Sequence, residues 1–86
     1  MIRVEVLGPG CIRCLRLEQE AARAIELAGV EAEVRKISDL RAILDYGVLS
    51  TPGLVIDGRV VSVGRIPRAE EIAGWLAAVA RPAGAS

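Results

Sequence analysis

The segment at residues 8–14, Gly-Pro-Gly-Cys-Ile-Arg-Cys, constrains this chain most, because it separates a strand-like pattern from a helix-like one. Both cysteines of the chain, Cys11 and Cys14, lie in it. On a helix, their spacing places both sulfurs on one face within a single turn, close enough for a disulfide of ordinary geometry. The pair can therefore alternate between two free thiols and a disulfide.

The two thiols are expected to differ in reactivity. Cys11 is predicted to stand at the start of a helix, where unpaired N–H groups and the helix dipole favour a thiolate, and Arg13 adds a nearby cation. Cys14, one turn later, is expected to lie closer to the core. We predict that Cys11 is the nucleophile and Cys14 the resolving thiol. A C-x-x-C pair also occurs as half of a metal site or as an inert buried pair, and both alternatives stay open here.

Composition excludes several classes of function. The chain has 86 residues, enough for one domain, and its aromatic residues are Tyr46 and Trp75, so the core must be aliphatic. Eleven basic residues balance eleven acidic ones, which argues against nucleic acid as a partner. Histidine is absent, which excludes Ser/His and Cys/His nucleophilic sites and any metal site with histidine ligands.

The chain is expected to work in the cytoplasm, without a membrane. No stretch shows the order of a signal peptide, and no apolar run reaches membrane-spanning length. In the cytosol a C-x-x-C pair is more often catalytic or metal-binding than a structural cross-link.

Hydrophobic periodicity predicts the element order βαβαββα. A strand over residues 2–7 is followed by a helix over 11–28, which Gly29 ends, and by a charged edge strand over 30–37. Ser38 is the expected cap of a short helix over 39–46 with a stripe of Leu40, Ile43 and Leu44. Asp57-Gly58 is expected to join strands 54–56 and 59–63 as a hairpin, and Ile72, Trp75, Leu76 and Val79 form the buried face of a last helix. The domain is expected to span residues 1–80, with a flexible tail over 81–86.

That order resembles the thioredoxin fold in its minimal form, because Cys-x-x-Cys opens the first helix and Thr51-Pro52 precedes the third strand. The chain is similar to the small thioredoxin-like redox-active disulfide proteins. Three segments carry the resemblance: residues 8–14, the Tyr-Gly-Val-x-x-Thr-Pro segment at 46–52, and the Val-Ile-Asp-Gly hairpin at 55–58.

The resemblance implies an α/β fold with a four-stranded mixed sheet in the order 2-1-3-4. The first and last of its three helices would cover one face, and the middle helix the other. It also implies a cis Thr51–Pro52 bond beside the cysteines, with the backbone of Thr51 bonding an extended substrate. A trans proline that merely starts a strand is the alternative. The expected substrate-binding residues are Thr51, Pro52, Pro9, Ile12, Arg13 and Gly64.

Glu5 lies six residues before Cys11, where the resemblance implies a buried acidic residue beneath the second cysteine. A buried carboxylate must be paired or protonated, and Glu5 could accept the proton of Cys14. The alternative is a partly exposed Glu5 paired with Arg3 or another arginine.

The resemblance therefore implies an enzyme, a thiol–disulfide oxidoreductase of the protein-disulfide reductase type, whose redox-active disulfide joins Cys11 and Cys14. No bound cofactor or metal is expected, so a partner reductase or a small thiol must supply electrons. Gly10 replaces the usual Trp and Ile12-Arg13 the usual Gly-Pro, so the reduction potential cannot be carried over. A soft-metal carrier for Cu(I) or Zn is the competing class, although such domains run βαββαβ. A non-catalytic adaptor is a third class.

Overall fold

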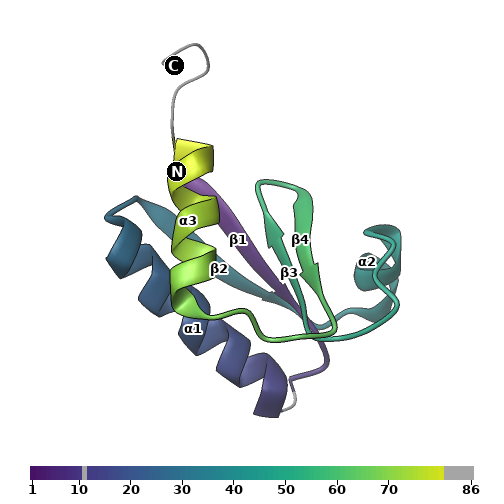
Figure 1. The fold of residues 1–86 in the computed structure, drawn as a ribbon. Helices are drawn as coiled ribbons and strands as arrows, with labels where there is room; N and C mark the ends of the chain where they lie inside the picture. Colours follow the sequence, from purple (N-terminus) through teal and green to yellow (C-terminus); the bar gives the residue numbers. More distant parts are fainter. Residues whose placement is uncertain (11, 81–86) are drawn as a thin grey trace.

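The computed structural model describes residues 1–10 and 12–80; the predicted nucleophile Cys11 and the predicted tail over 81–86 lie outside this part of the chain. Within it the element order is βαβαββα, as predicted (Figure 1). The elements are β1 (Ile2–Leu7), α1 (Ile12–Ala28), β2 (Ala32–Ile37), α2 (Leu40–Asp45), β3 (Gly53–Ile56), β4 (Arg59–Val63) and α3 (Ala69–Ala80).

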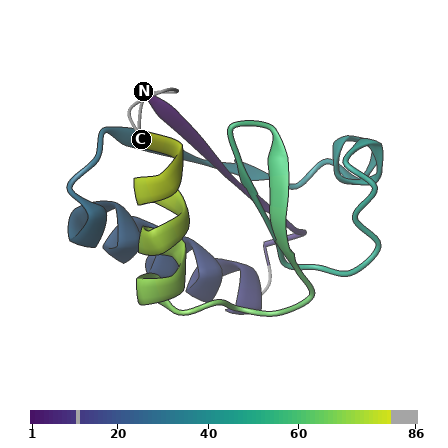
Figure 2. The ribbon, with the colours of Figure 1, turned by 45° about the horizontal axis from the view of Figure 1, so that its top comes forward.

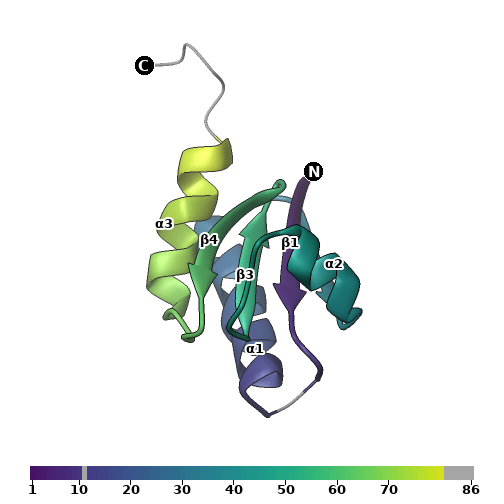
Figure 3. The ribbon, with the colours of Figure 1, turned by 90° about the vertical axis from the view of Figure 1, so that its right-hand side faces the viewer.

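The strands of the described residues form one four-stranded mixed sheet in the order β2-β1-β3-β4, which confirms the predicted topology. β1 pairs in parallel with β2. On its other side β1 pairs antiparallel with β3, and β3 pairs antiparallel with β4 (Figure 3). Asp57 and Gly58 both adopt positive φ, at 48° and 82°, as a tight two-residue hairpin requires. The central strand β1 thus has a hydrogen-bonded neighbour on each side.

The two faces of the sheet are covered by different helices. α1 and α3 pack together on one face, while α2 lies on the other (Figures 1 and 2). Side chains alternate along β1 accordingly: Val4 and Val6 pack on the α1 side, and Leu7 packs with Ile43 of α2 on the opposite side. This alternation decides which residues of β1 and β2 can face Cys14.

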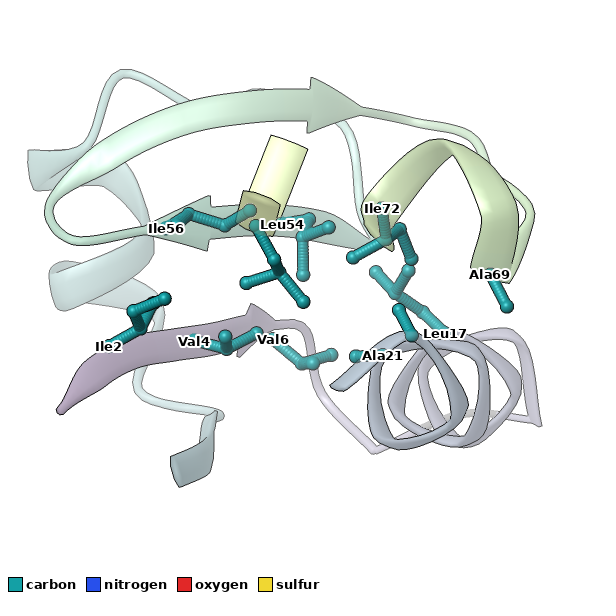
Figure 4. Packing of buried hydrophobic residues seen from close by; sticks show 11 residues of the cluster. Ile2, Val4, Val6, Leu17, Ala21, Leu54, Ile56, Ala69 and Ile72 are labelled. Carbon is teal, nitrogen blue, oxygen red and sulfur yellow. The ribbon is translucent and has the colours of Figure 1, made fainter. Parts of the chain in front are cut away.

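The larger core is aliphatic, as the composition predicts. It joins β1, β3, α1 and α3, with Leu17 and Ile72 completely buried between the two helices and the sheet (Figure 4). Trp75 is half-buried and packs against this cluster, in agreement with its predicted place in the core. Val79, which the periodicity places on the buried face, is 42% exposed, because it lies in the last turn of α3 after the cluster ends. The buried members of the cluster are Ile2, Val4, Val6, Leu17, Ala21, Ala24, Leu54, Ile56, Ala69, Ile72 and Leu76.

The short helix α2 differs from the prediction in its cap and its buried face. Asp39, and not Ser38, is the N-cap residue, and its carboxylate accepts a hydrogen bond from the Arg41 N–H at 3.4 Å. Leu40 and Leu44 are 68% and 51% exposed, so the predicted apolar stripe is wrong for both. A helix of six residues contacts the sheet through one position, and the geometry gives that position to Ile43.

The strand β2 begins at Ala32, two residues later than predicted. Gly29 ends α1 with a φ of +64°, and its N–H donates to the carbonyl of Ile25 at 3.0 Å. The chain needs the next two residues to turn from this cap into the sheet. β2 is the predicted charged edge strand.

Candidate functional site

The site lies where α1 begins, beside the end of β1 and the loop that leads into β3. Gly8 follows β1, and a Cβ built on it would overlap the Sγ atom of Cys14 and lie 3.8 Å from the Cβ of Thr51. The sulfur of Cys14 therefore fills the space that a side chain at position 8 would need. Cys14, in the first turn of α1, is 4% exposed, as expected for a thiol that lies close to the core. Gly8, Cys14 and Thr51, which we call the thiol cluster, thus come from three separate segments.

Pro52 anchors the loop that carries Thr51. The Thr51–Pro52 peptide bond is cis, and Pro52 is buried. The carbonyl of Pro52 accepts a hydrogen bond from the Gly64 N–H at 2.9 Å, and the carbonyl of Gly64 accepts one from Nη2 of Arg13 at 3.0 Å. A continuous set of hydrogen bonds therefore connects the first turn of α1, the end of β4 and the start of β3.

Arg13 and Gly64 both take part in these contacts. Both were expected to bind substrate, and both use polar groups to hold the loops around the thiol cluster. Gly64 has a φ of +74°, which favours glycine, and a Cβ there would lie 3.2 Å from the Cβ of Ser50. Their direct contact with substrate stays a prediction.

Two hollows flank the thiol cluster, and Pro9 lines both. One, of about 210 Å³, is also lined by Cys14 and by Lys36 of β2. The other, of about 390 Å³, lies between Thr51 and α2 and has mainly aliphatic walls that include Leu49. Ile12, at the first position of α1, is 81% exposed beside the site.

Exposed leucines around the second hollow were missed as site residues. Leu49 is 87% exposed, and Leu40 and Leu44 are also largely exposed. The periodicity assigned Leu40 and Leu44 to the core. The position of Leu49, two residues before Thr51, was the one available signal that an apolar side chain lies beside the substrate loop.

Glu5 is buried, at 8% exposure, but its observed partner is neither Arg3 nor another arginine. The Tyr46 hydroxyl donates a hydrogen bond of 2.6 Å to its Oε1. Glu5 alternates with Val4 and Val6, so it lies on the α2 side of the sheet, opposite α1 and Cys14. Its predicted role as proton acceptor for Cys14 stays a prediction that this geometry does not favour.

The same contact perturbs the phenol. The pKa of Tyr46 is raised, first because its hydroxyl donates to Glu5, then because of burial and the negative charge of Glu5; the charge of Arg3 opposes the shift. Tyr46 also packs against the cluster of Leu7, Ile43, Val48 and Val55. Tyr46 is therefore a packing residue that satisfies a buried carboxylate.

Two negative findings concern the described residues alone. Within residues 1–10 and 12–80, no three or more His, Cys, Asp or Glu side chains are grouped as a metal site would require. None of the helices in that same part of the chain combines the length and apolar character needed to cross a bilayer.

The packing at Gly8 gives a first prediction. Replacing Gly8 with Ala places a methyl group on the Cys14 sulfur, so the thiol or β1 must shift. We expect Gly8→Ala to lower stability by about 1–3 kcal/mol, as overpacking does, and to slow disulfide exchange by about 100-fold, as a misplaced reacting group does. Urea unfolding and stopped-flow exchange measure both effects.

Gly74→Ala is the matched control for Gly8→Ala. A Cβ at Gly74 meets nothing within 4 Å on the exposed side of α3, so it should stabilise the protein by roughly 0.5–1 kcal/mol. Its exchange rate should equal that of the natural protein. If Gly8→Ala behaves like Gly74→Ala, the close packing at the thiol cluster is wrong.

The raised pKa of Tyr46 gives a second prediction. Tyr46 is the chain's only tyrosine, so its titration can be followed without interference from another phenol. Ultraviolet titration of the folded protein should place its midpoint above the unperturbed value of about 10, and Glu5→Ala should bring it back toward that value. Because the folded pKa is the higher one, the pair's contribution to stability is fully present below the unfolded pKa. It is lost as the pH rises through the folded pKa. An unshifted midpoint in the natural protein would contradict the Glu5–Tyr46 contact.

Comparison with known proteins agrees with this architecture. The profile of the family described as "Thioredoxin domain" matches residues 2–77. A protein named "Thioredoxin" from Methanothermobacter thermautotrophicus is 38% identical over 72 residues, which cover 84% of this chain and 94% of that protein. Another "Thioredoxin", from Methanocaldococcus jannaschii, is 35% identical over 72 residues, covering 84% of this chain and 83% of that one. The chain belongs to the thioredoxin domain family.

Proposed function

We propose that this protein is a thiol–disulfide oxidoreductase that reduces or exchanges protein disulfides through Cys11 and Cys14. The observation that carries the proposal is the thiol cluster, in which the buried sulfur of Cys14 packs against Gly8 at the start of α1, and Gly8 in turn lies close to Thr51. The family and the two relatives named thioredoxin support the same redox chemistry.

The proposed reaction has two exchange steps. The Cys11 thiolate attacks one sulfur of the substrate disulfide, so a mixed disulfide forms and the other substrate sulfur leaves as a thiolate. The Cys14 thiolate then attacks the Cys11 sulfur, and the second substrate sulfur leaves. The substrate gains two electrons, and the protein forms the Cys11–Cys14 disulfide. Cys11 lies outside the described residues, and its role rests on the helix start at Ile12 that follows it.

The proposed substrate is an extended polypeptide that bonds to the backbone of Thr51. Pro9, Ile12 and Gly64 surround the thiol cluster with uncharged surface, and Arg13 extends that surface at the start of α1. Pro52 is buried next to Thr51 and would act through the conformation of that residue. An uncharged, mostly apolar surface is suited to the unfolded or locally opened segments in which protein disulfides become accessible.

The proposal includes a partner and a compartment. No cofactor is needed other than the Cys11–Cys14 disulfide, so a reductase or a small thiol would return two electrons after each turnover. We place the protein in the cytosol, where a redox C-x-x-C pair is kept reduced and catalytic.

Insulin reduction by dithiothreitol tests the proposed function. The natural protein should accelerate it, and Cys11→Ser should abolish the acceleration because the attacking thiolate is gone. Cys14→Ser should accumulate a mixed disulfide between Cys11 and insulin that mass spectrometry detects. Circular dichroism of both variants checks that the fold is kept.

Metal binding without accelerated insulin reduction would favour the soft-metal carrier. Stoichiometric Cu(I) binding that both serine variants abolish, together with insulin reduction no faster than dithiothreitol alone, would replace the oxidoreductase with a soft-metal carrier. Equal acceleration by Cys11→Ser and the natural protein would also overturn the assigned roles.

A further inference from the structure

The smaller hollow places one charged residue beside Cys14. Among the described residues that line this space of about 210 Å³, Lys36 is the one with a charged side chain. Lys36 is in register with Val6 of β1, whose side chain packs on the α1 side of the sheet. The stem of Lys36 therefore rises from the edge strand toward the helix that carries Cys14.

A carboxylate completes this arrangement. Glu18 follows Cys14 by four residues on α1, so the two side chains are neighbours on one helix face. Its Oε2 atom is buried, has no hydrogen-bond partner within the described part of the chain, and lies 3.9 Å from Nζ of Lys36. A buried carboxylate oxygen without a hydrogen bond is costly, which marks it as a group available to accept a proton.

The other charged groups near Cys14 are directed elsewhere. Arg13 donates to the carbonyl of Gly64, and Glu5 is bonded to Tyr46 on the opposite face of the sheet. β1 presents uncharged residues on this side, and the loops contribute Ser38 and Thr51, which do not titrate in the working range. Lys36 is the charged residue that lines the hollow beside Cys14, and Glu18 is the carboxylate paired with it among the described residues.

We propose that Glu18 accepts the proton of Cys14 in the resolving step and that Lys36 stabilises the resulting thiolate. This inference rests on the proposed function and deepens it. Before transfer, the cation of Lys36 faces the carboxylate of Glu18; after it, the same cation faces the thiolate of Cys14. The net charge of the three groups stays constant, so the thiolate of the buried Cys14 does not form without a cation nearby.

The step balances in atoms and electrons. The proton of Cys14 passes to Glu18 directly or through one water. The thiolate attacks the Cys11 sulfur of the mixed disulfide, the Cys11–substrate bond breaks, and the Cys11–Cys14 bond forms. The substrate sulfur leaves with the electron pair and takes a proton from solvent, and Glu18 returns its proton to solvent.

The reaction with dithiobis(nitrobenzoate) has two phases, and the second isolates the attack by Cys14. In the reduced protein, Cys11 should release one equivalent of coloured thionitrobenzoate as it forms the adduct, and Cys14 should release the second as it resolves it. Glu18→Gln should slow the second phase by about 100-fold at neutral pH, a loss typical of a missing general base. Its deficit should shrink as the pH rises, because hydroxide then removes the proton.

Lys36→Met should move the pH profile of the second phase to higher pH, because the thiolate loses its cation, with about a tenfold loss at neutral pH. Lys36→Arg keeps the charge and should restore the profile. In both Glu18→Gln and Lys36→Met the first phase should keep its rate. A merely structural defect would lower the rate by a constant factor at every pH.

The chain supplies a matched control pair on the same strand. Glu33 and Arg35 form an ion pair of 3.2 Å, and by alternation they lie on the face of β2 opposite Lys36. Glu33→Gln and Arg35→Met should leave both phases within about twofold, as exposed ion pairs contribute little.

The outcomes separate the two proposals. A second phase unchanged in Glu18→Gln and Lys36→Met overturns this inference. A second phase that is slowed by Glu5→Gln and not by Glu18→Gln assigns the proton to Glu5 instead. A natural protein without any second phase overturns the proposed function itself.

Discussion

The close packing of the Cys14 sulfur against Gly8 is the contact on which the rest of the site depends. β1 ends at Leu7, and the next residue must lack a side chain because the sulfur occupies that volume. Protein interiors are packed densely enough that a single methyl group there would displace either the helix or the strand. The distance between the central strand and the first turn of α1 is thereby fixed by one glycine.

Hydrogen bonds carry this constraint to the other side of the site. Arg13, one residue before Cys14, reaches the carbonyl of Gly64, and the N–H of Gly64 reaches the carbonyl of Pro52. The loop bearing Thr51 is therefore attached to the same helix turn that carries the buried thiol. A site assembled from three separate segments in this way keeps its geometry because each segment is bonded to another.

The fold could be predicted from the sequence where local chemistry decides it. The alternation of residues 2–7, the glycine after residue 28 and the Asp57-Gly58 turn each require one backbone conformation, and the structure has all three. The cap of α2 could not be settled, because Ser38 and Asp39 are adjacent and both are good cap residues. The exposure of Leu40 and Leu44 depends on how little of the sheet a six-residue helix covers, which periodicity does not reveal.

The burial of Cys14 and the cis Thr51–Pro52 bond agree with what the sequence predicted, and the charges of the site were much less predictable. The partner of Glu5 is Tyr46, 41 residues later, so no local pattern connects them. Lys36 was visible only as part of a charged edge strand. Its register with Val6, which turns it toward α1, comes from the pairing of two strands that are separated by a whole helix.

Thiol counting combined with intact mass after mild oxidation tests the central claim most directly. Cys14 is held in the first turn of α1 and Cys11 precedes that helix in the sequence, so diamide should convert the monomer to a form with no titratable thiol and a mass lower by that of two hydrogen atoms. Dithiothreitol should reverse the change. Thiols that survive oxidation, or disulfides that form only between chains, would contradict the account.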